Sequence, residues 1–289
     1  MTRGLYNPRL ERDACGFGLL ANLDGNPSHR IVADALAALE RMTHRGAVAA
    51  DGLSGDGCGI LLALPGRFIR SVTDLPEDQA VAVGMVFLAA DGDDEASMRA
   101  IEDALTERSW AIGGWRDVPV EPSVIGDHAR KTLPRIRQVF ASRPGTPGSA
   151  ELERSLFLAR RAVESQFNPR QTYIASLSTR TIAYKGLCLP GNLPRLYPDL
   201  RSPELETSIA VFHQRFSTNT TPSWRLSQPF RLLAHNGEIN TIAGNRAWAH
   251  ARHAKWHSPV FEGMRYAAPE FSPDESDSAS LDQMLEFLI

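Results

Sequence analysis

Short apolar runs alternate with segments of helical periodicity along most of this sequence, and this alternation limits the chain to a mixed α/β or α+β fold. Runs of strand length predict strands at 16–23, 59–64, 81–89, 209–212 and 230–234. Apolar side chains that recur every three to four residues predict helices at 30–43, from the acidic segment 91–95 to Leu105, at 151–164 and at 276–289. An all-helical protein is excluded.

Two further apolar segments, separated by three residues, predict a local antiparallel pairing. Residues 171–177 and 181–185 are expected to form a β-hairpin. Only the short segment 144–149 resembles a linker, so no domain boundary is predicted. The last predicted helix stops at Ile289 without a capping residue, and we therefore expect the sequence to be a truncated piece of a longer protein.

Composition and charge favour small-molecule chemistry. The chain is 43% hydrophobic and 22% charged, as soluble globular proteins are, and its net charge of −3 offers no attraction to nucleic acid or an anionic membrane. The longest apolar stretch, 80–90, is shorter than the roughly 18–20 residues that span a bilayer, and the N-terminus lacks the features of a signal peptide. The three widely spaced cysteines form no disulfide framework, which predicts a cytoplasmic location.

Cys15 stands between a largely polar N-terminal segment and the first predicted strand. If residues 1–14 were removed, Cys15 would carry a thiol and a free α-amine on one residue. Reference pKa values of about 8.5 for a thiol and about 7.7–8.0 for an α-amine would let the amine accept the thiol proton near neutral pH. The alternative is a small buried apolar residue, because free cysteines are usually buried.

Two other segments place polar side chains at the ends of predicted strands, where such groups can line a pocket. Arg215 follows the strand at 209–212, and its planar guanidinium could bind both oxygens of a carboxylate; a structural ion pair is the alternative. Asn236 and Gly237 follow the strand at 230–234. Asn-Gly is a turn signal, yet both residues could also hold a developing oxyanion, and one such donor contributes about 2.7–4 kcal/mol in a transition state.

Five short motifs occur in the order seen in one enzyme family. They are Asp13-Ala14-Cys15-Gly16-Phe17-Gly18, His44-Arg45-Gly46 with Ser54-Gly55-Asp56-Gly57, Arg215-Phe216-Ser217-Thr218, His235-Asn236-Gly237-Glu238, and Ser276-Asp277-Ser278. In these motifs the chain resembles the class II glutamine amidotransferases, which are N-terminal-nucleophile hydrolases. Within that family, the segments that begin at Gln214 and Gln228 most resemble the amidotransferase domain of glutamate synthases.

The resemblance implies catalytic roles for three residues. Cys15 would be the nucleophile, exposed when a propeptide of residues 1–14 is removed, and its own α-amine would be the general base. Asn236 and Gly237 would form the oxyanion hole for the intermediate on the side-chain amide carbon of glutamine.

The resemblance also implies residues that bind the substrate. Arg215 would bind the α-carboxylate of glutamine and Asp277 its α-ammonium group, and Phe216 and Thr218 would belong to the same substrate site. Asp274 lies three residues before Asp277, and sequence spacing does not separate the two. The alternative role for Asp277 is that of a helix N-cap.

The fold, cofactors and partners follow from the same resemblance. The family fold is an α+β, four-layer αββα sandwich of two antiparallel sheets between helices, and it would occupy residues 15–289. In a glutamate synthase the ammonia would pass to downstream synthase domains or a synthase subunit, where 2-oxoglutarate is aminated with FMN and an iron–sulfur cluster. Electrons would come from ferredoxin, or from NADPH through a small FAD-containing reductase subunit. None of these cofactors is expected in this chain, because Cys58 and Cys188 cannot supply a cluster.

No metal site is expected either. His250, His253 and His257 share one helical face, but basic residues surround them and no carboxylate lies within that helix. Two other functions remain open at this point. The first is a class II amidotransferase that serves a different ammonia acceptor, and the second is an inactive domain that binds glutamine or only packs against a synthase.

Overall fold

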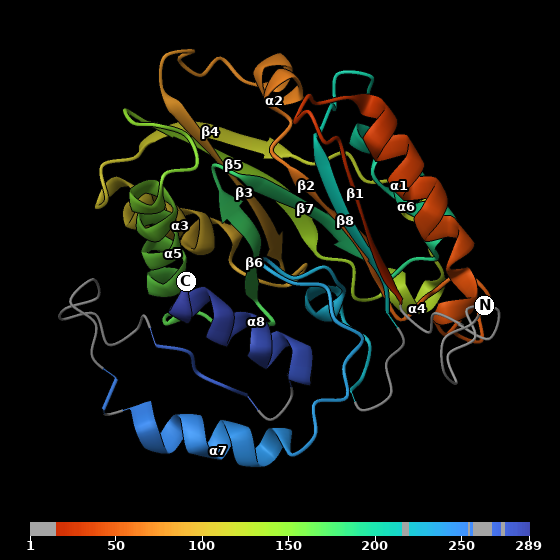
Figure 1. Cartoon of the computed structure of the whole chain (residues 1–289). Coiled ribbons are helices and arrows are strands. Elements are labelled where there is room, and N and C mark those ends of the chain that lie inside the picture. Colours follow the sequence, from red (N-terminus) through yellow and green to blue (C-terminus); the bar gives the residue numbers. More distant parts are fainter. Residues whose placement is uncertain (1–15, 216–219, 254, 257–267, 273–274) are drawn as a thin grey trace, which may run out of the picture.

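The computed structural model describes residues 16–215, 220–253, 255–256, 268–272 and 275–289, and its strands form two four-stranded antiparallel sheets (Figure 1). Across the first sheet the order is β1 (Phe17–Ala21), β8 (Ile209–Gln214), β2 (Cys58–Ala63) and β7 (Thr181–Gly186). Across the second sheet it is β4 (Ala111–Asp117), β5 (Arg135–Arg143), β3 (Ala80–Leu88) and β6 (Thr172–Ser178).

Helices pack against both sheets. Their bounds are α1 (His29–Arg41), α2 (Gly66–Val72), α3 (Asp94–Thr106), α4 (Asp127–Arg130), α5 (Ala150–Glu164), α6 (Leu193–Leu196), α7 (Ile242–His253) and α8 (Asp277–Leu288). α3 and α5 pack on the second sheet, and α1 packs on β1 and β8 of the first (Figure 1). The expected α+β fold of two antiparallel sheets with helices is therefore confirmed. Within the described segments, no helix is both long and apolar enough to cross a bilayer.

Local sequence explains the main elements. Every side chain from Cys58 to Leu62 in β2 is buried, so this strand is a continuous apolar run and not an alternating one. In α1 the buried residues Val32, Ala35 and Leu39 recur on one helical face. They belong to the larger core, which joins apolar side chains of both sheets.

The hairpin expected from 171–177 and 181–185 is not formed. β6 pairs with β3 in the second sheet and β7 pairs with β2 in the first, so the link between them carries the chain from one sheet to the other. Glu153 of α5 fixes this corner, because its carboxylate accepts hydrogen bonds from the Thr179 backbone N–H (2.8 Å) and the Ser178 hydroxyl (2.7 Å). The periodicity predicts both strands, but strand partners distant in sequence decide the pairing.

Residues 230–234 do not form the predicted strand. The backbone N–H groups of Arg231 and Leu232 donate to the two carboxylate oxygens of Asp282 on α8, at 3.4 and 2.9 Å. A carboxylate thus satisfies backbone groups that a neighbouring strand would otherwise pair with. Phe230 is buried even so, and its apolar character was the reason for the prediction.

Two strands of the second sheet, β4 and β5, lie where no strand is predicted. Gly113 and Gly114 interrupt the apolar pattern of β4, and the register with β5 shifts at this point. Gly114 has φ +107°, a conformation that favours glycine. In β5, Arg135 and Arg137 alternate with buried residues, and this period-two pattern was the available signal for a strand.

A buried group of charged side chains docks α8 against α5. The group consists of Arg160, Glu164, Arg231, Asp282 and Glu286, and is called the α8 ion cluster below. Glu164 contacts Arg160 at 2.6 Å and Arg231 at 2.9 Å, and Arg160 also contacts Glu286 at 2.8 Å. Burial raises the pKa of Glu164, but the surrounding arginines outweigh burial and lower this pKa to about 2.

Replacing Glu164 with Gln is expected to lower the free energy of unfolding by about 3–5 kcal/mol, because it leaves buried guanidinium groups without their carboxylate. Urea unfolding at pH 7 measures the change. Glu151→Gln on the same helix is the matched control, since Glu151 is 75% exposed in its pair with Arg143, and it should change stability by less than about 0.5 kcal/mol. Equal effects from the two substitutions would contradict the importance of the cluster.

Candidate active site

Three of the five sequence motifs meet at the C-terminal end of β8. The backbone N–H of Gln214 donates to the Gly16 carbonyl at 2.6 Å, and that of Arg215 donates to the Gly57 carbonyl at 2.8 Å. Gly46 lies against the Gln214 side chain so closely that a Cβ there would overlap its amide group. Segments far apart in sequence thus converge around one strand end.

The fourth motif joins this group through Asn236. The Gly16 backbone N–H donates to Asn236 Oδ1 at 2.9 Å. A backbone N–H can only donate, so this contact fixes the side-chain oxygen toward Gly16 and turns the NH₂ group of Asn236 away from it. Gly16 has to be glycine, because a Cβ there would lie 2.5 Å from the Gln214 carbonyl oxygen. The residue bonded to Cys15 therefore orients the Asn236 amide.

Arg215 is 4% exposed at the same strand end. Its Nη1 donates to the Asp56 backbone oxygen at 3.5 Å, and its Nη2 donates to the Thr220 hydroxyl at 2.5 Å. Burial lowers the pKa of Arg215, and the nearby carboxylates of Asp56 and Asp277 oppose this effect. The structural ion pair considered above would involve Asp56 or Asp277, but the hydrogen bonds that Arg215 makes to described residues go to a backbone carbonyl and a hydroxyl. Arg215 is thus a buried cation whose described hydrogen-bond acceptors are neutral.

The fifth motif brings Asp277 beside the Asn-Gly turn. Gly237 and Glu238 have φ +92° and +69°, so the turn expected from the sequence is formed. A Cβ on Gly237 would lie 3.4 Å from Asp277 Oδ1. The N-cap of α8 is Ser276, whose hydroxyl accepts from the Ala279 N–H at 3.1 Å, and Asp277 is the first residue of the helix. The carboxylate of Asp277 is therefore not needed as an N-cap.

Two residues with no predicted role, His235 and Ser278, contact the Asn-Gly turn and Asp277. The Gly237 N–H donates to His235 Nδ1 at 3.0 Å, and Ser278 Oγ lies 2.9 Å from the same nitrogen. Asp277 accepts hydrogen bonds from the backbone N–H groups of Ile239 and Ser278, both at 2.6 Å. His235 and Ser278 belong to the sequence motifs quoted above. The atoms that they contact depend on how α8 packs, and this packing cannot be predicted from the motifs.

Several predicted residues lie outside the described segments. They are Cys15, Phe216, Thr218, Asp274 and His257. Their roles stay predictions. In the part of the chain that the structure describes, no three His, Cys, Asp or Glu side chains lie close enough together to hold a metal ion.

Cys58 and Cys188 are distant in sequence but adjacent in the fold. Their sulfur atoms lie 3.5 Å apart, both residues are fully buried, and both are free thiols. The hydrogen bond with Cys188 and burial raise the pKa of Cys58 well above its usual range. Neither thiol has exposed surface from which to attack a substrate, so neither is a candidate nucleophile in this arrangement.

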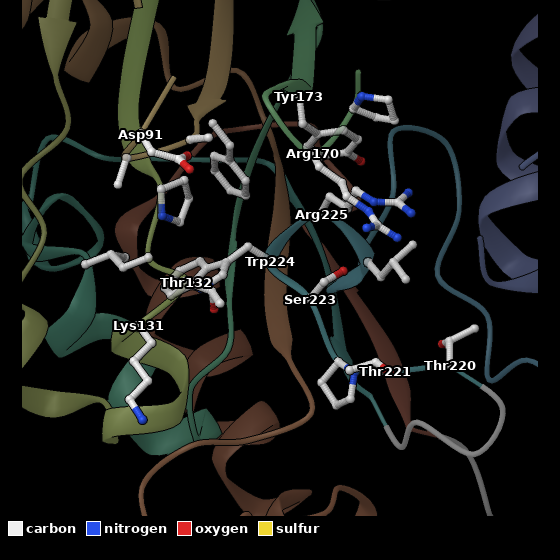
Figure 2. Close-up of a pocket in the computed structure, with 18 residues that line it drawn as sticks. Asp91, Lys131, Thr132, Arg170, Tyr173, Thr220, Thr221, Ser223, Trp224 and Arg225 are labelled. Atoms are coloured by element: carbon white, nitrogen blue, oxygen red, sulfur yellow. The ribbon is translucent and has the colours of Figure 1, made fainter. Parts of the chain in front are cut away.

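A cavity in the described part of the chain is not lined by Asn236, Gly237 or Asp277. It has a volume of about 990 Å³ and is lined by residues from 87–91, 131–134, 169–173 and 220–226 (Figure 2). Thr220, at its edge, is the residue that accepts from Arg215. The cavity thus adjoins the candidate site at Thr220.

Comparison with known proteins gives one family. The model of class-II glutamine amidotransferases matches residues 15–289. The chain is 40% identical to the glutamate synthase [NADPH] large chain of Azospirillum brasilense, over 100% of this chain and 20% of that protein. It is 41% identical to ferredoxin-dependent glutamate synthase 2 of Arabidopsis thaliana (96% and 18%) and 38% identical to glutamate synthase [NADH] of Saccharomyces cerevisiae (99% and 14%). The chain spans about a fifth or less of the length of these relatives.

His213 is a buried titratable residue of β8, 1% exposed and two positions before Arg215. Burial and the neighbouring Arg215 guanidinium lower its pKa to about 4, because both disfavour the charged imidazolium. Between pH 6.5 and 4 the unfolded chain therefore binds a proton at this position that the folded chain does not. Stability must fall as the pH falls through this window.

We expect His213 to remove about 3 kcal/mol from the free energy of unfolding between pH 6.5 and pH 4. His213→Gln should flatten this part of the pH profile, whereas His250→Gln, at an exposed position of α7, should leave the slope unchanged. Urea unfolding at several pH values measures both slopes. A wild-type slope in His213→Gln would show that another group is responsible.

Proposed function

Because the chain belongs to the class II glutamine amidotransferases, we propose that it hydrolyses L-glutamine to L-glutamate and ammonia with Cys15 as the nucleophile. The hydrogen bond from Gly16 to Asn236 carries this proposal, since it joins the residue after Cys15 to the side chain expected to stabilise the intermediate. We propose further that removal of residues 1–14 frees the α-amine of Cys15, and that this amine takes up the thiol proton.

Two side chains of opposite charge are proposed to recognise free glutamine. The buried guanidinium of Arg215 would bind the α-carboxylate through its planar pair of donors. Asp277 would bind the α-ammonium group, and its backbone hydrogen bonds hold the carboxylate in place. A glutamine within a peptide carries neither charge, so the pair would select the free amino acid. Phe216 and Thr218, close to Arg215 in sequence, are proposed to line the same site.

The proposed chemistry follows from these positions. Attack of the Cys15 thiolate on the side-chain amide carbon forms a tetrahedral intermediate with a negatively charged oxygen. The Asn236 NH₂ group, turned away from Gly16, and the Gly237 N–H would donate to that oxygen. Ammonia leaves with a proton from the α-ammonium group of Cys15. Water then hydrolyses the γ-glutamyl thioester, releases glutamate and restores the thiol.

The similarity to glutamate synthases supports a wider proposal for the longer protein. The ammonia would pass to downstream synthase domains and aminate 2-oxoglutarate, which makes the chain part of ammonia assimilation and glutamate biosynthesis. FMN, an iron–sulfur cluster and a reductant, either ferredoxin or NADPH through a flavin-containing reductase subunit, would act outside this chain. The free thiols of Cys58 and Cys188 support a reducing compartment, and we propose the cytoplasm.

Cys15→Ala is expected to abolish glutamine hydrolysis, because it removes the proposed nucleophile. Cys58→Ala should keep activity within about twofold of wild type, since Cys58 is buried in β2. A coupled assay for released glutamate measures both, and circular dichroism checks that both variants fold. Equal loss in both folded variants would assign catalysis to the wrong thiol.

The intact mass of the active protein tests whether residues 1–14 are removed, which the Cys15→Ala substitution alone does not test. Active wild-type chain should begin at Cys15. A fully active population that retains residues 1–14 would exclude the free α-amine as the base. Full activity of Cys15→Ala would exclude the proposed nucleophile altogether. Activity without an ammonia acceptor would also separate a working glutaminase from an inactive glutamine-binding domain.

Arg215→Lys should raise the KM for glutamine by about 10- to 100-fold with a smaller effect on kcat, because an ammonium group cannot replace the planar two-donor contact. Steady-state kinetics measure the change. Arg195→Lys, on α6 and away from the site, is the control and should leave KM unchanged. An unchanged KM in Arg215→Lys would remove Arg215 from the substrate site.

A further inference from the structure

The Gly237 N–H, the proposed second donor to the oxyanion, already has an acceptor. It donates to His235 Nδ1 at 3.0 Å. Since a backbone N–H carries a single proton, it cannot serve His235 and an oxyanion fully at the same time. The oxyanion hole is therefore incomplete in this arrangement, and something has to release Gly237 when substrate is bound.

Ser278 is the group that can release it. Its hydroxyl oxygen lies 2.9 Å from His235 Nδ1, 3.3 Å from Asp277 Oδ1 and 3.5 Å from the His235 carbonyl oxygen. Because Nδ1 accepts the Gly237 N–H, it bears no proton, so the Ser278 hydroxyl can approach it only as a donor. Nδ1 has one lone pair, and the Ser278 O–H and the Gly237 N–H compete for it.

The charge on Asp277 decides where the Ser278 proton lies. The Asp277 carboxylate accepts two backbone N–H groups and, while no ammonium group is bound, still competes with His235 for the Ser278 proton, because hydrogen bonds to an ionised group are stronger than those to a neutral one. Ser278 is 1% exposed, so water does not offer its hydroxyl an easy alternative partner. Both acceptors are within reach of the Ser278 hydroxyl, His235 Nδ1 at 2.9 Å and Asp277 Oδ1 at 3.3 Å, so its one proton is shared between them and the Gly237 N–H retains part of the Nδ1 lone pair.

We propose that Ser278 and His235 form a substrate-operated switch that completes the oxyanion hole only when an α-ammonium group binds Asp277. The proposal rests on the proposed function, since it takes Asp277 as the ammonium ligand. The ammonium group competes for the Asp277 carboxylate, the Ser278 hydroxyl then donates to His235 Nδ1 alone, and the Gly237 N–H is released toward the reacting amide. No bond is made or broken in this step. Ser278 and His235 are positioning residues, and the switch links recognition of free glutamine to the rate of its hydrolysis.

The test compares glutamine with glutaramate, which has the same side-chain amide and carboxylate but no α-ammonium group. Ser278→Ala should lower kcat for glutamine by about 3- to 10-fold, the worth of one hydrogen bond, with KM changed by less than about twofold. It should leave kcat for glutaramate unchanged, because that substrate never operates the switch. Equal losses with both substrates, or no loss with glutamine, would overturn the proposal.

A second variant covers the case in which Ser278→Ala does not fold. His235→Phe keeps a ring of similar size but has no acceptor for Gly237, so it should raise kcat for glutaramate by about 3- to 10-fold. An unchanged or lower kcat for glutaramate in folded His235→Phe would overturn the switch. Ser280→Ala, which removes another buried hydroxyl from α8, is the matched control and should change neither substrate's kcat.

Failure of the switch is distinguishable from failure of the proposed function. Wild-type chain must first hydrolyse glutamine in a way that Cys15→Ala abolishes. If it does not, the proposed function fails before Ser278 is tested. If it does, and Ser278→Ala slows glutamine and glutaramate equally, only the switch is excluded.

Discussion

Part of the site depends on Arg231, because two of the segments that supply its polar groups lie outside the sheets. Asn236 and Gly237 lie in an irregular segment before α7, and Asp277 opens α8. Arg231 holds both segments against the sandwich: its guanidinium binds Glu164 of α5 and Glu286 of α8, and its backbone N–H bonds to Asp282. Because these charges are buried together, loss of one leaves the others unpaired at several kcal/mol. For these two segments, the α8 ion cluster takes the place of the hydrogen bonds that a sheet would provide.

The sequence predicts those elements whose pattern is decided locally. α1, α3 and α5 each bury one face at helical spacing, and β2 and β3 are continuous apolar runs, so their existence and type could be predicted. Residues 230–234 have the same apolar character as a strand, yet their backbone bonds to Asp282, about fifty positions later. A local sequence pattern does not predict a hydrogen-bond acceptor so distant in sequence. The pairing of β6 and β7 is equally unpredictable from local sequence, because these strands are joined by a short link but pair in different sheets.

The site is predictable to the level of residues but not of atoms. The motifs indicate that Gly16, Arg215, Asn236 and Gly237 belong together, and the described residues of these motifs do converge at the end of β8. The motifs do not predict which atoms of these residues form hydrogen bonds with one another. The donor of Gly237 points at His235, a contact that exists only because α8 packs where it does. Whether Cys15 lies in line with these groups stays a prediction.

The buried thiols of Cys58 and Cys188 can report local unfolding of the protein. Both residues lie in the larger core with no exposed surface, and Cys58 stands at the end of the β2–β7 ladder, paired with Gly186. An alkylating reagent can reach them only when that ladder separates, so the rate of their modification measures how often this part of the sandwich opens. One alkylating reagent would thus give two rates in the same molecule. The fast rate reports modification of the proposed nucleophile, and the slow rate reports local unfolding of the surrounding fold.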